Sequence, residues 1–382
     1  MRRTLFDDDH EAFRDSVRRF VTDKVVPVFG EWEAAGVLPR EFFADIAALG
    51  VTGLGVPEEY GGTGIDDYRY NVVVQEEAAR AAVTLGTLRT QVDVILPYFV
   101  HLADPAQKAR WLPGIAAGTT LTAIALTEPG TGSDLAGVRT RARRDGDRYI
   151  LDGAKTFITG GLLADLVIVL ARTGEDPDDR RGGLTLLVVE GDAPGFARGR
   201  TLDKIGLRAQ DTVELSFSDV RVPVSNRLGE EGRAFEYLAR NLAQERLAIA
   251  VGATAQARAA VDLTIGYAHD RRVFGRELAA FQNTKFEIAA VATEVEAAQS
   301  LLDRAVAALV AGELSPADAA MVKLFCTEAQ GRVTDRCLQV FGGYGYVREY
   351  PIARLFADAR VTRIYGGTSE VMKSIISKSL GL

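Results

Sequence analysis

The sequence predicts a chain of three parts, with helices at both ends and a β domain between them. Apolar residues recur every three or four positions in the first third, short runs of strand composition fill the middle, and long Ala-rich amphipathic segments follow. This α–β–α pattern divides the 382 residues into parts at 1–119, 120–231 and 232–382. The length suits two to three domains.

The first part reads as helical. Pro27 interrupts or bends the first segment, and Gly50 and Gly118 end later ones. The predicted helices cover residues 10–33, 42–49, 70–82 and 111–117.

The middle part carries closely spaced short strands separated by turn signals such as Asp145-Gly146 and Asp152-Gly153. The predicted strands cover residues 121–126, 137–143, 149–151, 166–171, 184–190 and 212–217. Because no helical pattern separates them, they favour an antiparallel barrel or sandwich over a doubly wound sheet.

The last part is predicted to form long helices over residues 235–267, 281–311 and 315–340, with a further helical piece from 358 onward. Ser315-Pro316 has the residue types of an N-cap followed by proline at the first helical position.

Composition excludes several classes of function. With 45 Lys and Arg against 52 Asp and Glu, the net charge of −7 argues against a sequence-independent nucleic-acid binder. Two cysteines cannot form a disulfide framework, and three histidines make a metal site unlikely on composition, so no metal is expected. No apolar run approaches the roughly 18 residues that span a bilayer, and we expect a soluble, cytoplasmic protein without membrane partners.

A glycine-rich loop, Thr127 to Asp134, directly follows a predicted strand. Its glycines and hydroxyls suit a polar cofactor or phosphate, although a plain turn is equally compatible. A dinucleotide fingerprint is not supported, because the third glycine is missing. Phe157-Ile158-Thr159 offers an aromatic face and a hydroxyl, or ordinary strand packing.

Three glycine or arginine breaks interrupt the helical part. Arg271 to Gly275 could clamp a phosphate or form a solvated loop. Phe341 to Tyr346 and Ile364 to Glu370 place glycines where helices do not tolerate them cheaply, so the chain turns there or a ligand approaches the backbone. A helix starting after Thr368-Ser369 would offer free N–H groups to an anion.

Glu245-Arg246 lies within a predicted long helix among apolar neighbours. On an exposed face Glu245 would pair with an arginine at helical spacing. On a buried face it would be a carboxylate with a raised pKa, suited to take a proton. The residues alone leave both readings open.

Taken together and in this order, these motifs resemble the acyl-CoA dehydrogenase family over essentially the whole chain. The pieces that carry the resemblance are Ala125 to Asp134, Phe157 to Thr159, Arg271 to Gly275, Gln339 to Gly343 and Ile364 to Glu370. The resemblance implies an N-terminal helical domain, a middle β-barrel and a C-terminal four-helix bundle. It also implies FAD as the cofactor, a homotetramer, and an electron-transfer flavoprotein as acceptor.

One departure from the family pattern concerns the catalytic base. Many members carry a glutamate where this chain has Gly366, whereas a long-chain and isovaleryl-type branch carries it on the long helix before an arginine. Glu245-Arg246 matches that position. The resemblance therefore implies Glu245 as the base for the α proton, flavin N5 as the hydride acceptor, and the Gly366 N–H as a donor to the thioester oxygen.

The resemblance assigns further residues one by one. Those implied to bind the cofactor are Leu126, Thr127, Ser133, Phe157, Thr159, Arg271, Phe274, Gln282, Gln339, Gly343, Thr368 and Glu370, some of them reaching the FAD of a neighbouring subunit. Those implied to bind substrate are Ser133, Arg246 and Gly367. Phe157 departs mildly, since many relatives have tryptophan there.

The implied activity is α,β-dehydrogenation of a saturated acyl-CoA to a trans-2-enoyl-CoA, as in fatty-acid β-oxidation. Three alternatives stay open: the same oxidation on an acyl carrier protein, a flavin-dependent monooxygenase, and a non-catalytic subunit with the same fold. Glu245 counts against the last two, because neither needs a carboxylate base. Chain length and branching of the acyl group are not given by the sequence.

Overall fold

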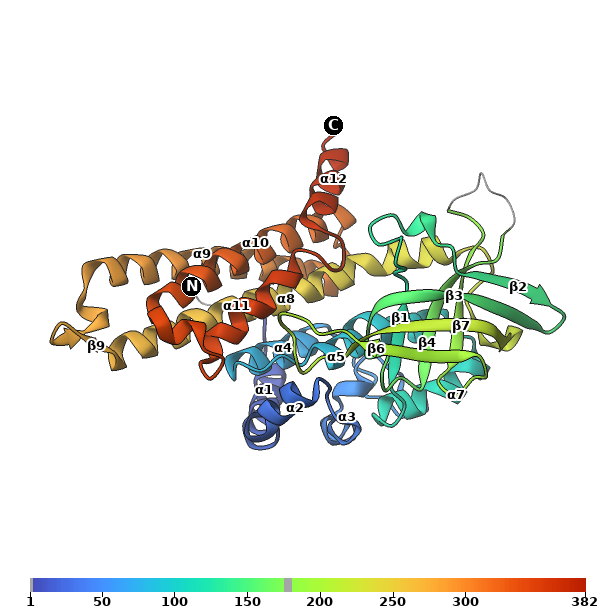
Figure 1. Ribbon diagram of the computed structural model, residues 1–382, viewed down its shortest axis with the longest axis horizontal. Helices are drawn as coiled ribbons and strands as arrows, with labels where there is room; N and C mark the ends of the chain where they lie inside the picture. Colours follow the sequence, from blue (N-terminus) through green and yellow to red (C-terminus); the bar gives the residue numbers. More distant parts are fainter. Residues whose placement is uncertain (1–2, 175–180) are drawn as a thin grey trace.

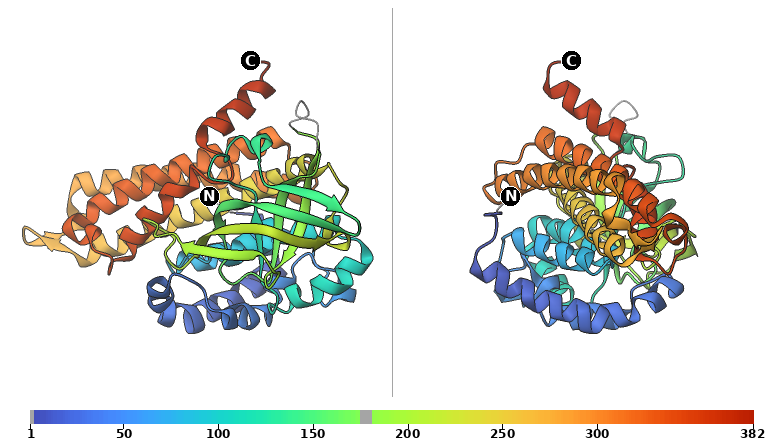
Figure 2. Two further views of the ribbon diagram at one scale, coloured as in Figure 1. Left: turned by 45° about the vertical axis from the view of Figure 1, so that its right-hand side comes forward. Right: turned by 90° about the vertical axis from the view of Figure 1, so that its left-hand side faces the viewer.

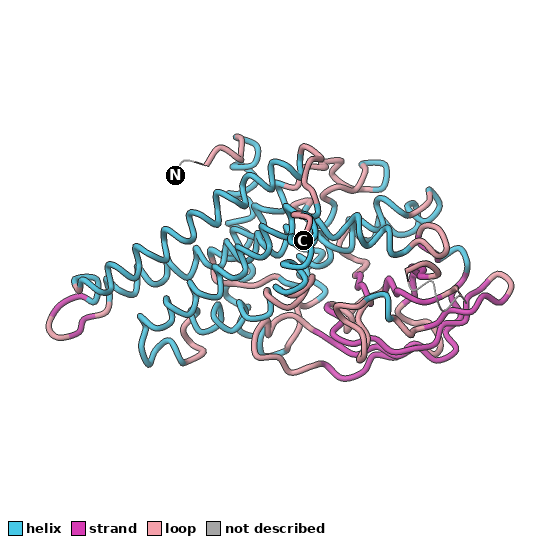
Figure 3. The backbone as a smooth tube through the Cα atoms, turned by 90° about the horizontal axis from the view of Figure 1, so that it is seen from above, coloured by secondary structure: helices cyan, strands magenta, loops and turns pink. Residues whose placement is uncertain are grey.

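The computed structural model describes residues 3–174 and 181–382. Helices of the first and last parts lie side by side, and a sheet built from the middle of the chain packs at one end of them (Figure 1). Seen from above, the strands gather in one region while the helices occupy the remainder (Figure 3). The predicted α–β–α class is therefore confirmed.

Helices of the first part form one face of the molecule (Figure 2). They are α1 (Asp8–Phe20), α2 (Phe29–Ala35), α3 (Arg40–Ala47), α4 (Arg69–Arg80), α5 (Gly86–Arg89), α6 (Leu96–Leu102) and α7 (Pro105–Ala116). The predicted helix over 10–33 is divided, because a π turn and a 3₁₀ turn containing Pro27 separate α1 from α2. The sequence analysis did not predict α5 and α6, which help to build the site.

The middle part forms an open sheet. Its strands are β1 (Thr122–Ala125), β2 (Arg141–Asp145), β3 (Arg148–Thr159), β4 (Leu166–Arg172), β5 (Leu184–Glu190), β6 (Phe196–Thr201), β7 (Thr212–Pro223) and β8 (Arg227–Leu228). They are ordered β6-β7-β3-β2-β4-β5-β8, and β1 pairs with β4.

The expectation of a closed antiparallel barrel is wrong on both points. The edge strands β6 and β8 do not pair with each other, and β8 is only two residues long, which is too short to close a barrel. In addition, β1 runs parallel to β4. The pairing of β3 with β7 shifts register between Lys155 and Ile158, and this irregularity sets the direction of Phe157.

The last part is a bundle of four packed helices with a fifth projecting from it. These are α8 (Ala234–Asp270), α9 (Gln282–Val310), α10 (Pro316–Phe341), α11 (Pro351–Thr362) and the projecting α12 (Ser369–Ser379). Ser315 caps α10 by accepting a hydrogen bond from the Asp318 N–H, as predicted. A small hairpin, β9 (Arg272–Val273) and β10 (Arg276–Glu277), joins α8 to α9.

The two helical parts meet where α4 packs against α8. This junction lies beside the sheet (Figure 1). Residues of α4 and α8 line the cavity described below. Among the described residues, no helix is both long enough and apolar enough to cross a membrane.

Candidate active site

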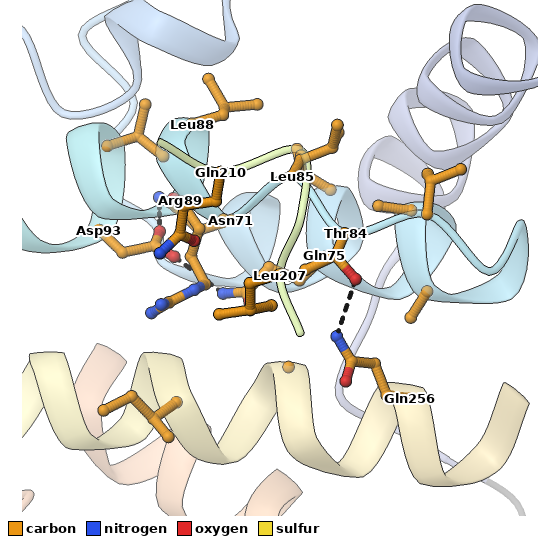
Figure 4. A pocket seen from close by; sticks show the side chains of 18 of the residues that line it. Asn71, Gln75, Thr84, Leu85, Leu88, Arg89, Asp93, Leu207, Gln210 and Gln256 are labelled. Atoms are coloured by element: carbon orange, nitrogen blue, oxygen red, sulfur yellow. Dashed lines mark hydrogen bonds between the residues drawn. The ribbon is translucent and has the colours of Figure 1, made fainter. Parts of the chain in front are cut away.

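A cavity of about 50 Å³ lies between α4 and α5, α8, and the loop before β7 (Figure 4). Aliphatic side chains such as Val74, Leu88 and Ile249 form much of its wall. Polar groups also reach it, among them Asn71, Gln75, Arg89, Asp93, Gln210 and Gln256. The cavity can therefore enclose a mainly apolar group that carries a polar function.

Glu245 lies inside the molecule, with 8% of its surface exposed. It precedes Ile249 by one helical turn, so both point from the same face of α8 toward the cavity region. The Tyr98 hydroxyl donates a hydrogen bond to Glu245 Oε1 over 3.0 Å. Of the two readings left open by the sequence, the structure has the buried one.

Burial raises the pKa of Glu245 to about 7, because desolvation disfavours the carboxylate. The hydrogen bond from Tyr98 and the positive charges of Arg246 and Arg89 act in the opposite direction. A carboxyl group with a pKa near neutrality can accept a proton and release it again at neutral pH.

The Gly366–Gly367 turn lies against Ile249, which follows Glu245 by one turn of α8. Both glycines have positive φ, 60° and 95°, which favours glycine. A Cβ at position 366 would lie 2.3 Å from Ile249 Cδ1, so the space that a side chain would need is filled. The Gly366 N–H makes no hydrogen bond within the part of the chain that the structure describes, so it is free to donate to a ligand.

A buried lysine holds this turn. Lys323 is 1% exposed, and its Nζ donates to the Gly367 carbonyl oxygen. Burial and the nearby Arg246 charge lower the pKa of Lys323 to about 8. The hydrogen bond ties the turn to α10 and fixes the direction of the backbone before it.

The sheet contributes an exposed aromatic ring and a hydroxyl. Phe157 is 67% exposed and has a φ of 59°, unusual for a non-glycine residue. Thr159 Oγ1 accepts a hydrogen bond from Gln210 Nε2 at 3.1 Å, and Gln210 also lines the cavity. Thr159 therefore lies beside the cavity, and Phe157 precedes it by two residues on β3.

The glycine-rich loop is fastened to this strand. The Thr156 N–H donates to the Thr127 carbonyl. Buried Glu128 accepts bonds from the backbone N–H groups of Arg139 and Thr140 and from Lys155 Nζ, all within 2.9 Å. The loop glutamate is thus structural, while Leu126 and Thr127 are partly exposed and Ser133 is exposed.

A second group of predicted residues lies elsewhere. Arg271, Phe274, Gln282, Gln339 and Gly343 are exposed at the end of the bundle near β9, away from the sheet (Figures 1 and 2). Phe274 is 95% exposed at the hairpin tip. Within one chain, therefore, the structure does not bring this group together with Phe157.

The residues of the last motif, Ile364 to Glu370, lie partly at the cavity and partly at the start of α12. Thr368 caps α12, its hydroxyl accepting a hydrogen bond from the Val371 N–H at 3.3 Å. Glu370 lies exposed in the first turn of that helix. Tyr365 lines the cavity, and the two glycines follow it.

Sequence reasoning missed several polar residues of the site: Tyr98, Arg89, Asp93, Gln210 and Lys323. They stand outside any recognisable motif, and three of them lie on the unpredicted segment around α5 and α6. Tyr98 meets Glu245 across 147 residues of sequence, a contact that only the packing of α6 against α8 creates.

A helix–sheet–helix chain with a buried carboxylate, an apolar cavity and an exposed aromatic face has the architecture of a flavin-dependent oxidoreductase. Models of the N-terminal, middle and C-terminal domains of acyl-CoA dehydrogenase match residues 7–119, 123–220 and 232–381. The chain is 40% identical to the mitochondrial long-chain specific acyl-CoA dehydrogenase of Sus scrofa, over 99% of this chain and 88% of that protein.

Solved structures agree with these matches. An acyl-CoA dehydrogenase from Geobacillus kaustophilus superimposes with a TM-score of 0.97 at 42% identity, covering 99% of this chain and all of that one. A glutaryl-CoA dehydrogenase from Mycobacterium smegmatis in complex with FADH2 has a TM-score of 0.90 at 31% identity, covering 98% and 95%. This chain belongs to the acyl-CoA dehydrogenase family, and it is an FAD-dependent oxidoreductase.

The residues present fit a flavin. The exposed Phe157 ring offers an aromatic face, and the Thr159 hydroxyl lies two residues away on the same strand. Gln210 Oε1 is buried without a hydrogen-bond partner among the described residues, as expected where a donor from a ligand completes the site.

Proposed function

We propose that this enzyme removes the α proton and the β hydride of a saturated acyl-CoA, giving a trans-2-enoyl-CoA, with Glu245 as the base. The observation that carries the proposal is the pairing of a buried Glu245 with a side-chain-free Gly366. The carboxylate has its pKa near 7, and Ile249 fills the space that an acidic side chain at 366 would need.

The chain's own groups divide the work. Glu245 takes the α proton, and the Tyr98 hydroxyl holds the carboxylate oriented through its 3.0 Å hydrogen bond. The Gly366 N–H donates to the thioester oxygen as negative charge develops there, and Lys323 keeps the turn in place through Gly367. Closure of the apolar wall excludes water from the base.

Arg246 supports this arrangement from behind the base. It is 6% exposed, and its Nε has no partner within the described part of the chain. Its charge opposes the rise in the pKa of Glu245. We assign it to the thioester arm or to orientation of the carboxylate, and Gly367 and Ser133 to contacts with the same substrate.

FAD, when bound, supplies the acceptor for the β hydride. We assign Leu126, Thr127, Ser133, Phe157, Thr159, Thr368 and Glu370 to the FAD held by the same chain, and Arg271, Phe274, Gln282, Gln339 and Gly343 to that of a neighbouring subunit. The separation of the two groups within one chain supports a shared cofactor. We therefore propose a homo-oligomer, with a tetramer as the expected form.

The remaining assignments follow the family resemblance. We propose an electron-transfer flavoprotein as the physiological acceptor and fatty-acid β-oxidation as the setting. The division at 1–119, 120–231 and 232–382 stays our proposal for the domains, supported by the change from helix to strand and back. A cytoplasmic location stays a prediction.

The test is anaerobic reduction of the flavin by a panel of saturated acyl-CoAs, followed at the oxidised absorbance band. We expect at least one acyl-CoA to bleach the wild-type protein and none to bleach Glu245→Gln at a comparable rate. Glu236→Gln, an exposed change on the same helix, is the matched control and should react like wild type.

Two results would contradict the proposal. Bleaching of Glu245→Gln as fast as wild type would show that Glu245 is not the base. If the protein is saturated with flavin and no acyl-CoA reduces it, the substrate would instead be a carrier-protein thioester, or the reaction would be a monooxygenation.

A further inference from the structure

Arg89 places a positive charge on the wall of the cavity. It ends α5, is half-buried, and lines the space between α5 and α8 (Figure 4). Its guanidinium carbon lies 5.5 Å from the centre of the Tyr365 ring. Tyr365 directly precedes Gly366, so the charge is close to the proposed position of the thioester.

The charge of this guanidinium acts on two buried carboxyl groups, lowering the pKa of Asp93 and of Glu245. Within the described residues, Arg89 forms no ion pair and donates no hydrogen bond. Arg246 and Lys323 add two more buried positive charges near the Gly366 turn. Arg89 therefore keeps its five N–H donors available to a ligand.

The two carboxyl groups on which the Arg89 charge acts, Asp93 and Glu245, both accept hydrogen bonds from other side chains. Asp93 accepts hydrogen bonds from Asn71 Nδ2 at 2.7 Å and Gln75 Nε2 at 2.8 Å. Glu245 accepts from Tyr98. Burial raises the pKa of both carboxyls to about 7, so neither is a full negative charge at neutral pH.

An unsubstituted acyl chain would not suit this wall. It would cover the guanidinium with methylene groups and remove its water without offering an acceptor, which is costly for a charged group. A carboxylate on the chain would instead match the planar donor fork of arginine with two parallel hydrogen bonds.

We propose that Arg89 determines specificity by binding a carboxylate at the far end of the acyl group, so that the substrate class is the CoA thioester of a dicarboxylic acid. This inference rests on the proposed function, because it names the acyl group that the same cavity accepts. The contact of Arg89 with Tyr365, next to Gly366, and the small cavity favour a short chain.

The experiment compares acyl-CoAs matched in chain length on the FAD-loaded enzyme. Succinyl-, glutaryl- and adipyl-CoA are set against butyryl-, pentanoyl- and hexanoyl-CoA, with kcat/KM from an artificial electron acceptor and Kd from the shift of the flavin spectrum. We expect at least one dicarboxylic thioester to exceed its matched partner by roughly tenfold or more in kcat/KM.

Variants then assign that preference to the guanidinium. Arg89→Leu should lower the ratio of dicarboxylic to monocarboxylic kcat/KM by roughly 30-fold or more, and Arg89→Lys should fall between the two. Arg80→Leu, at an exposed position at the end of α4, should leave the ratio unchanged. Because the ratio is measured within each variant, a general loss of flavin or activity cancels.

Distinct results separate this inference from the proposed function. If monocarboxylic thioesters reduce the flavin and dicarboxylic ones are poorer in every pair, the inference is wrong and the proposed function stands. An Arg89→Leu ratio equal to wild type in both kcat/KM and Kd also overturns it. If none of these thioesters reduces the flavin while a longer saturated acyl-CoA does, the inference is wrong and the proposed function stands; if no acyl-CoA of any length reduces it, both fail.

Discussion

The Tyr98 hydroxyl provides a sharp test of how the pKa of the proposed base, Glu245, is set. It is a hydrogen-bond donor to the Glu245 carboxylate, at 3.0 Å. Tyr98→Phe removes this donor and leaves the ring that packs against α8. Since the bond favours the ionised carboxylate, its loss should raise the pKa of Glu245 above the wild-type value of about 7.

The size of the effect follows from the bond. A hydrogen bond to a charged group contributes about 1.5 to 3 kcal/mol, and about 1.4 kcal/mol corresponds to one pKa unit. A rise of one unit reduces the ionised fraction at pH 7 from about a half to about a tenth. Flavin reduction by a saturated acyl-CoA should therefore slow by about fivefold at pH 7 and by less than about 1.2-fold at pH 9.

The assay is the rate of anaerobic flavin reduction in a stopped-flow instrument at a series of pH values. If Glu245 is the base, as proposed, wild type should react faster as pH rises through about 7, because the carboxyl group must lose its proton to act. Tyr98→Phe should show the same plateau with the midpoint moved upward. Tyr149→Phe is the matched control, because that hydroxyl also donates to a carboxylate, that of Glu231, outside the cavity.

A slower Tyr98→Phe enzyme with an unchanged midpoint would refute this reasoning. It would mean that the hydroxyl serves packing or substrate binding and does not tune the base. A shift of similar size in Tyr149→Phe would show that the pH response is a general property of the fold.

Three further predictions concern the cavity. Gly366→Ala should lower thermal stability and flavin reduction together, because its Cβ meets Ile249 and φ is positive; an unchanged melting temperature and rate would contradict the stated clash. Lys323→Met should lower kcat about tenfold or more with the flavin retained, since Gly367 loses its donor; an unaltered kcat would remove the lysine from the mechanism. Burial raises the pKa of Asp93 from about 4 to about 7, so the folded state keeps a proton that the unfolded state releases, and this group destabilises the fold increasingly from pH 4 to 7. Asp93→Asn should therefore gain stability relative to wild type as pH rises over that range in urea unfolding, and a relative loss would show that the sign is wrong.

Much of the fold was predictable because its elements are long and periodic. The helices α8 and α10 carry a 3.6-residue apolar pattern over many turns, and Ser315 marks the start of α10 in the way that an N-cap requires. Strand β6 was missed because Phe196–Thr201 carries two arginines and a glycine, and it pairs only at an edge. Closure of the sheet depends on the register between distant strands, which local sequence does not encode.

The site was predictable where the backbone conformation requires a particular residue type, such as glycine. Glycines at 366 and 367 indicated either a turn of the chain or a ligand close to the backbone, and both have positive φ. The direction in which the Glu245 side chain points could not be predicted from the residues alone, because a buried and an exposed glutamate can have the same apolar neighbours in sequence. Its environment depends on Tyr98, which tertiary packing brings from 147 residues away.

The contact between Gly366 and Ile249 also constrains how such an enzyme can change over generations. An acidic side chain at 366 and an isoleucine at 249 compete for one volume, since even a Cβ would approach Ile249 to 2.3 Å. A substitution at 366 alone meets a filled space, and a smaller residue at 249 alone opens a void beside the working base. Moving the proposed base from helix to turn would therefore be coupled to position 249, where the isoleucine must rotate away or be replaced by a smaller residue.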